Sequence, residues 1–263
     1  MNKIIWGTGL LLLLLSGIWL LQRGYLLKPH DIQVEPVADV ERVTPEPAPI
    51  PKSVPVEVPV KQEEPKVKRD PFKTPFIVQA PNSEWDNPLF ENACEEASLL
   101  MVASLFRGNT TISPADTREE LLALAGYQKK QFGHSVDTSV ADTQMLLTEY
   151  FDIRDSKVIE AKNAEELISL LSEDTILIVP ADGQKLGNPF FTPPGPINHM
   201  LVILRYDAKT QEFITHDPGT KRGALYRYQA DILWSAIRDY PTGATHLPNN
   251  KKEKRMIAVP LEQ

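Results

Sequence analysis

The chain has 263 residues, of which 42% are hydrophobic and 24% are charged, and its formal net charge is −7. Residues 76–263 carry 18 Lys and Arg against 26 Asp and Glu. This acidic balance argues against nucleic-acid binding, which needs a basic surface for phosphate contacts. The single cysteine, Cys94, excludes intramolecular disulfides and any multi-cysteine zinc site.

The first predicted element is an apolar helix from Ile4 to Leu21, eighteen residues without a charge. Such a helix spans about 27 Å, close to the hydrocarbon thickness of a bilayer. A cleaved signal peptide is the alternative, but the run ends in Trp19-Leu20-Leu21-Gln22-Arg23, which has no small residues for a cleavage site. We therefore predict a membrane anchor in residues 1–28. The N-terminus is expected inside the cell and the remainder outside, as a single-pass protein of the cell membrane.

Residues 29–75 form the next predicted segment, with eleven prolines and no glycine. Its repeated Pro-Val and Pro-Glu phrases cannot bury a core and favour an extended polyproline-II spacer. Its reach would be on the order of 100 Å or more. A disordered linker is the alternative, and either form would hold a folded domain of residues 76–263 away from a membrane.

Helices are predicted first in that domain. The apolar run Cys94–Phe106 indicates a buried helix, and Ser113 and Pro114 are typical of the start of a second helix ending near Leu124. Three more are expected, at Ser139–Tyr150, after Asn163 in a capping box, and at Ala230–Asp239.

The predicted strands come later. They cover Thr175–Pro180, His199–Tyr206, Glu212–Asp217, Ala224–Tyr228 and Met256–Val259. Helices followed by an antiparallel sheet indicate an α+β fold.

Cys94 stands where an irregular segment gives way to the apolar helix. The partial positive charge and free N–H groups of a helix N-terminus lower a thiol pKa and hold a developing oxyanion. The alternative is that Cys94 is a small buried hydrophobic residue.

His199 and Asp217 are predicted to face each other across a hairpin. A turn at Asp207-Ala208-Lys209 sets His199 opposite Asp217, so that the carboxylate can accept the imidazole Nδ1–H. The same alternation places His216 opposite Met200 on the other face, in a structural role.

A thiol at a helix start, a histidine at a strand start and an acid on the next strand are the groups that covalent acyl transfer requires. Cys94 would attack a carbonyl carbon, His199 would carry the proton, and Asp217 would orient the imidazole. The best second donor for the oxyanion is Gln79, followed by Asn87 and Asn92. No cofactor is expected, and no close pair of histidines indicates a metal site. A zinc site would need the scattered His30, His134 and His246 to converge with His199 or His216.

These residues also resemble a known group. Gln79, Ala80-Pro81, Trp85 and Cys94-Glu95-Glu96-Ala97-Ser98 precede Asn198-His199-Met200 and His216-Asp217-Pro218-Gly219. Together they are similar to the papain-like cysteine peptidases of the bacteriocin-leader-processing type, in their stand-alone C39-like branch. The resemblance spans about residues 76–263. It implies a papain-like fold, a triad of Cys94, His199 and Asp217, Gln79 at the oxyanion hole, and a peptide or protein substrate.

Three features depart from that pattern. Glu95-Glu96 replaces Gly-Pro, Asn198 replaces Gly before the histidine, and Gln79 lies fifteen residues before Cys94. Glu95 and Glu96 are expected chiefly to complement the helix dipole, although their charge opposes thiolate formation. The apolar loop of residues 187–196 is expected to line a substrate cleft or to pack in the core.

The sequence therefore predicts a membrane-anchored cysteine peptidase that hydrolyses peptide or isopeptide bonds through a thioester. Two alternatives stay open. One is a transglutaminase-like acyl transferase with the same triad, and the other is a papain-like binding module without turnover.

Overall fold

The computed structural model describes residues 67–172, 174–243 and 253–262. The predicted anchor of residues 1–28 and residues 29–66 of the predicted linker lie outside this part of the chain. Within the described residues, none of the helices combines the length and hydropathy needed to cross a bilayer.

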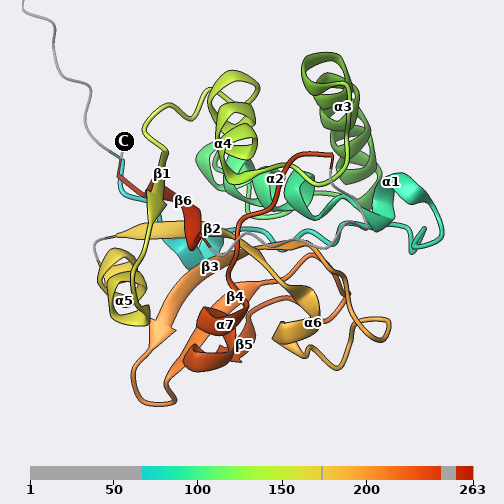
Figure 1. Ribbon diagram of the computed structural model, residues 1–263. Helices are drawn as coiled ribbons and strands as arrows, with labels where there is room; N and C mark the ends of the chain where they lie inside the picture. Colours follow the sequence, from blue (N-terminus) through green and yellow to red (C-terminus); the bar gives the residue numbers. More distant parts are fainter. Residues whose placement is uncertain (1–66, 173, 244–252, 263) are drawn as a thin grey trace, which may run out of the picture. The chain divides into compact units, whose positions relative to one another are not determined.

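A six-stranded antiparallel sheet is the framework of the described residues, with strand order β1-β6-β2-β3-β4-β5 (Figure 1). The strands are β1 Lys157–Glu160, β2 Thr175–Ala181, β3 His199–Asp207, β4 Glu212–His216, β5 Tyr226–Gln229 and β6 Arg255–Pro260. The strands β2 and β3 lie at the centre of the sheet, and every residue of β2 is buried.

Helices cover both faces of this sheet (Figure 1). The elements are a short 3₁₀ helix η1 at Pro71–Lys73, and helices α1 Pro88–Glu91, α2 Cys94–Phe106, α3 Pro114–Phe132, α4 Val140–Glu149, α5 Ala164–Ser172, α6 Gly183–Leu186 and α7 Ala230–Ala236. The helices α2, α3 and α4 lie on one face, and α5 and α7 lie on the other.

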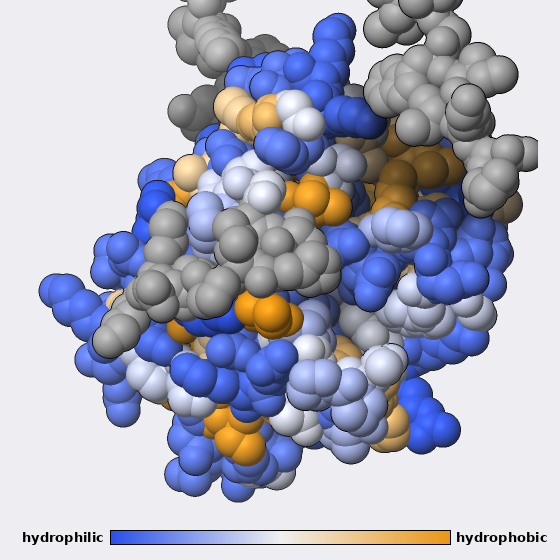
Figure 2. Space-filling model, turned by 45° about the vertical axis from the view of Figure 1, so that its right-hand side comes forward, coloured by the Kyte–Doolittle hydropathy of each residue, from blue (hydrophilic) through white to orange (hydrophobic). Residues whose placement is uncertain are grey.

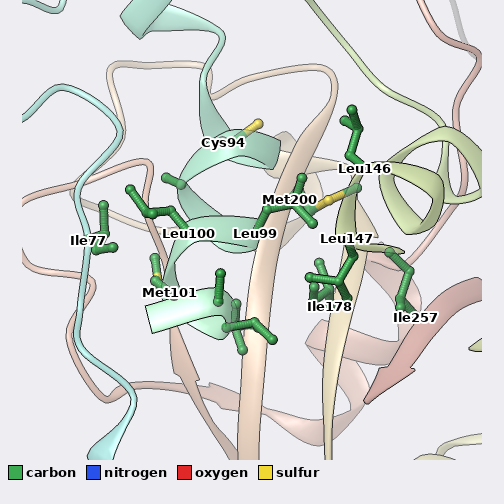
Figure 3. Packing of buried hydrophobic residues seen from close by; sticks show 14 of the residues in the cluster. Ile77, Cys94, Leu99, Leu100, Met101, Leu146, Leu147, Ile178, Met200 and Ile257 are labelled. Carbon is green, nitrogen blue, oxygen red and sulfur yellow. The ribbon is translucent and has the colours of Figure 1, made fainter. Parts of the chain in front are cut away.

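Alternating residues of the strands pack into two separate hydrophobic cores, because successive side chains of a strand point to opposite faces of the sheet. Ile178 and Met200 pack with α2 in the first core, whereas Leu177 and Leu201 pack with α5 and α7 in the second. In Figure 3, Met200 lies beside α2 close to Leu99. The face of the molecule seen in Figure 2 is mainly hydrophilic, with hydrophobic residues visible in places between the hydrophilic ones.

The predicted α+β class and its antiparallel sheet are confirmed. Helix α2 has the predicted bounds, and Ser113 and Ser139 cap α3 and α4 with their hydroxyl groups. Helix α3 runs eight residues beyond the expected end, until Gly133 takes a left-handed conformation. Helix α7 ends three residues early.

The predicted register of the hairpin between β3 and β4 is wrong. Glu212 pairs with Asp207, so the turn is longer than expected, and an irregularity between Ile203 and Arg205 shifts the pairing again. His216 therefore lies opposite Val202 rather than Met200. Asp217 falls just beyond the end of β4.

The folded part begins earlier than residue 76. Lys68 forms a β-bridge with Glu262, the Arg69 N–H donates to the carbonyl of Leu261, and Pro71 is buried in η1. Residues 68–75, assigned to the linker from their prolines, thus pack on the domain. Proline content does not reveal this, because a proline-rich segment can lie along a folded surface as readily as it can extend into solvent.

We expect Leu99→Ala in α2 to lower the free energy of unfolding by about 2–5 kcal/mol. The Leu99 side chain is fully buried, so its removal leaves a cavity in the core. Leu122→Ala, on the exposed side of α3, is the matched control and should cost less than about 1 kcal/mol. Urea unfolding measures both changes. Equal losses in the two variants would contradict this view of the core.

Candidate active site

Cys94 is the first residue of α2 and is buried. Its N-cap, Ala93, offers no side-chain hydrogen bond to the helix. The first backbone bond of the helix runs from the Ala97 N–H to the Ala93 carbonyl, so the N–H groups of Cys94 to Glu96 lie ahead of the helical ladder. The thiol donates a hydrogen bond to Glu95 Oε2 at 3.1 Å.

His199, the first residue of β3, pairs with Asp217 inside the protein. The two side chains are 2% and 0% exposed, and His199 Nε2 lies 2.8 Å from Asp217 Oδ1. The sequence placed Nδ1 against the carboxylate, whereas the structure places Nε2 there. The contact forms despite the shifted register. If the Val202–His216 pairing is continued, Asp217 is opposite Leu201, which makes His199 its diagonal neighbour on the same face.

Two side chains that the sequence analysis did not single out support Asp217. The Tyr228 hydroxyl donates to Asp217 Oδ2 at 2.6 Å, and the Asn188 amide lies 3.4 Å from the same oxygen. Burial opposes the charged form, but the charge and hydrogen bond of His199, together with the Tyr228 and Gly219 donors, hold the pKa of Asp217 below its ordinary value. Asp217 is therefore a carboxylate.

The imidazole is packed on its other sides. The ring of Phe191 meets His199 edge to face, with centroids 5.1 Å apart. A Cβ atom at Gly219 would lie 2.8 Å from His199 Cε1, a distance that would force the ring to move. The sequence Asp217-Pro218-Gly219 thus leaves room for the imidazole in one orientation.

Cys94 and His199 line the same cleft, which has a volume of about 550 Å³. Its lining includes Phe191 and residues 192–196 of the apolar loop, together with Trp85 and Glu91. The expectation that residues 187–196 border a cleft agrees with this geometry. Asn188 and Phe191 of the same loop are nevertheless buried.

Carboxyl groups surround the thiol. Glu95 and Glu96, which the sequence analysis expected to complement the helix dipole, lie in the first turn of α2 and are 1% and 2% exposed. Burial first, and then the charge and hydrogen bond of Glu95, raise the pKa of Cys94 well above its ordinary value. Asp137 and Glu96 contribute in the same direction. The thiol is therefore protonated at neutral pH in this structure.

Glu95 is held from three sides. Its Oε1 accepts hydrogen bonds from the Tyr240 hydroxyl at 2.6 Å and from the Thr138 N–H at 3.2 Å, while Oε2 accepts the thiol. Burial and the charge of Asp137 raise the pKa of Glu95 to about 7, although its hydrogen bonds act in the opposite direction. Burial also raises the pKa of Glu96, whose Oε1 accepts from Gln128.

Gln79 lies in the cleft wall, but its amide is already engaged. Its Nε2 donates to the carbonyls of Phe90 and Glu91, at 3.0 and 2.7 Å. Because both partners are acceptors only, the nitrogen must face them, and the side chain has no hydrogen left for an oxyanion in this conformation. Asn92 also borders the cleft and donates to the Pro88 carbonyl, whereas Asn87 caps α1.

The other histidines lie elsewhere. His216 Nε2 lies 3.0 Å from the Thr74 carbonyl, and its Nδ1 accepts from the Leu225 N–H. These contacts are structural. His134 is exposed, and His30 and His246 lie outside the described residues. Among the residues described, no group of three His, Cys, Asp or Glu side chains could hold a metal ion.

Comparison with known proteins gave one family. The sequence profile of the Peptidase C39 like family matches residues 73–241. No curated protein matches the chain. A crystal structure described as that of a candidate C39-like peptidase from Bacillus anthracis is 16% identical, with 73% of this chain and 97% of that chain covered and a TM-score of 0.41. A TM-score this low adds nothing to the family assignment.

The buried carboxyl of Glu95 predicts how stability varies with pH. Its pKa is higher in the folded chain, at about 7, than its ordinary 4.5. The folded chain therefore binds this proton more tightly, and the stabilisation is lost as the pH rises from 4.5 to about 7. We expect the contribution of Glu95 to this loss to be about 3 kcal/mol. Glu95→Gln should remove that contribution and leave the contribution of Glu96, whose pKa burial also raises. Chemical denaturation at a series of pH values measures it.

Glu119→Gln, at an exposed position of α3, is the control and should keep the pH dependence of the unchanged chain. Asp217 does not interfere, because its pKa is lowered and its contribution is lost only as the pH falls below 3.8. A Glu95→Gln variant with an unchanged pH dependence would contradict the assignment.

Proposed function

Because the chain belongs to the Peptidase C39 like family, we propose that it is a cysteine peptidase whose reacting groups are Cys94, His199 and Asp217. The observation that carries the proposal is the shared cleft. The thiol at the start of α2 and an imidazole paired with a buried carboxylate border the same cavity. The substrate would be a peptide or protein, cleaved at a peptide or isopeptide bond.

The orientation of His199 supports a proton path. Nε2 is held by Asp217, so Nδ1 is the nitrogen left to take the thiol proton. The Cys94 thiolate would attack the carbonyl carbon, and the imidazolium would return its proton to the leaving amine. Water would then hydrolyse the thioester by the same proton path in reverse. Asp217 stabilises the imidazolium in both steps, because it is charged and buried beside it.

The oxyanion would lie at the N-terminus of α2. The backbone N–H groups of the first turn have no carbonyl partner in the helix, and they carry the positive end of its dipole. Gln79 would join them only after its amide leaves the carbonyls of Phe90 and Glu91. Attachment of this domain to the outer face of the cell membrane remains part of the proposal, since the apolar segment of residues 4–21 lies outside the described residues.

One observation favours a second function, that of a binding module without turnover. Burial first, and then the carboxyl groups of Glu95, Asp137 and Glu96, raise the pKa of the thiol and keep it protonated. A cleft of this volume could then hold a peptide without cleaving it. The reactivity of Cys94 distinguishes the two functions.

We predict that His199→Ala slows the alkylation of Cys94 by iodoacetamide at pH 7 by about tenfold or more, because the imidazolium that stabilises the thiolate is lost. Hydrolysis of a mixture of labelled peptides, followed by the appearance of new amines, should fall by about a hundredfold or more. Cys94 is the only thiol in the chain, so alkylation reports on this site alone.

His134→Ala is the matched control, since His134 is exposed and outside the cleft. It should leave both rates unchanged. Equal alkylation rates in His199→Ala and the unchanged protein, together with no peptide hydrolysis by the unchanged protein, would favour the binding module.

We also expect Gly219→Ala to reduce hydrolysis by about tenfold or more, because the added methyl group occupies space that His199 and Phe191 use. Gly126→Ala, on α3 with no atom within 4 Å of the added carbon, is the control. It should keep full activity and gain about 0.5–1 kcal/mol of stability, as alanine favours a helix. Full activity of Gly219→Ala would show that the orientation of the imidazole is not required.

A further inference from the structure

The thiol of Cys94 is bonded to a carboxyl group rather than to the imidazole. Its hydrogen bond goes to Glu95 Oε2 at 3.1 Å, and none links it to His199 among the described residues. In a working thiol peptidase the thiolate and imidazolium form a pair. In this structure the sulfur instead contacts the carboxyl group of Glu95.

Hydrogen bonds hold the Glu95 side chain in this position. Its other oxygen is fixed by the Tyr240 hydroxyl and by the Thr138 N–H, which come from two different segments of the chain. Tyr240 is fully buried. A carboxyl group held by two donors and 1% exposed cannot turn away from the thiol without breaking bonds that water would not replace.

Several titratable groups face this pair. Glu96 follows on α2, Asp137 comes from the segment before α4, Tyr240 follows α7, and His199 borders the cleft from β3. Asp137 acts on both Cys94 and Glu95. Glu96 has its own partner, Gln128, and no bond to the thiol. Glu95 is thus the carboxyl group that contacts the sulfur.

We propose that Glu95 is a positioning residue that holds the Cys94 thiol in a protonated resting state, and that uptake of a proton by Glu95 frees the thiol for His199. This inference rests on the proposed peptidase function. As a carboxylate, Glu95 accepts the S–H hydrogen. Once it has taken a proton from solvent, the neutral carboxyl group can donate to sulfur instead. The thiol proton then passes to His199 Nδ1, which leaves a thiolate beside an imidazolium.

The release of the Cys94 thiol would depend on pH near neutrality. Because burial and Asp137 raise the pKa of Glu95 to about 7, both protonation states are populated near neutral pH.

The test is the pH dependence of Cys94 alkylation by iodoacetamide in the full-length chain, kept in detergent. We expect Glu95→Gln to move the midpoint of the rate profile down by about 1–3 pH units, since a like charge beside the thiol is removed. The alkylation rate at pH 8 should rise by about threefold or more, because the gain in thiolate exceeds the accompanying loss in nucleophilicity.

Two further variants keep the test decisive. Glu96→Gln removes an equally buried carboxyl group that does not contact the thiol, and it should move the midpoint less than Glu95→Gln does. Tyr240→Phe keeps Glu95 but removes a donor that favours its charged form. It should move the midpoint in the same direction as Glu95→Gln, and it provides the result if Glu95→Gln does not fold.

An unchanged midpoint in both Glu95→Gln and Tyr240→Phe would overturn the inference. Slower alkylation of Glu95→Gln at every pH would also overturn it, because Glu95 would then be the base that activates the thiol. Neither result would touch the peptidase proposal, which fails instead if His199→Ala leaves alkylation unchanged and the unchanged protein hydrolyses no peptide.

Discussion

The buried hydrogen bond between His199 and Asp217 is the interaction on which the site depends. A carboxylate with no exposure to water persists only where donors replace its hydration. Here they come from His199, Tyr228, Gly219 and, more weakly, Asn188. Each is supplied by a different part of the chain. The imidazole orientation, the cleft wall and the loop after β4 are therefore fixed together.

The second constraint is the cluster of carboxyl groups around Cys94. A thiolate, two glutamates and Asp137 cannot all be charged in so small a volume, because like charges in a poorly solvated site repel strongly. The structure resolves this conflict by keeping the thiol protonated and by raising the pKa of the carboxyl groups. Two of the three carboxyl groups in this conflict, those of Glu95 and Glu96, follow the cysteine directly in the sequence.

Much of the fold could be predicted because its signals are local. Apolar residues around the whole circumference of 94–106 indicate a buried helix, and the hydroxyl groups of Ser113 and Ser139 mark helix starts. The continuously apolar strand β2 indicates a sheet buried on both faces. The edge strand β1 was missed, since it is only half-buried and its side chains do not alternate clearly. Helix α3 was ended too early because its last two turns are polar.

The sequence by itself determined the order and type of the main elements, the family resemblance, and the pairing of Cys94 with His199 and Asp217 as candidate residues. These follow from residue types and short-range spacing. Only the tertiary structure decided the register of the β3–β4 hairpin, the imidazole nitrogen that meets Asp217, and the partners of Gln79 and Glu95. Contacts of this kind join residues up to 145 positions apart. No local pattern records them, because they arise only when separate elements pack and exclude water between them.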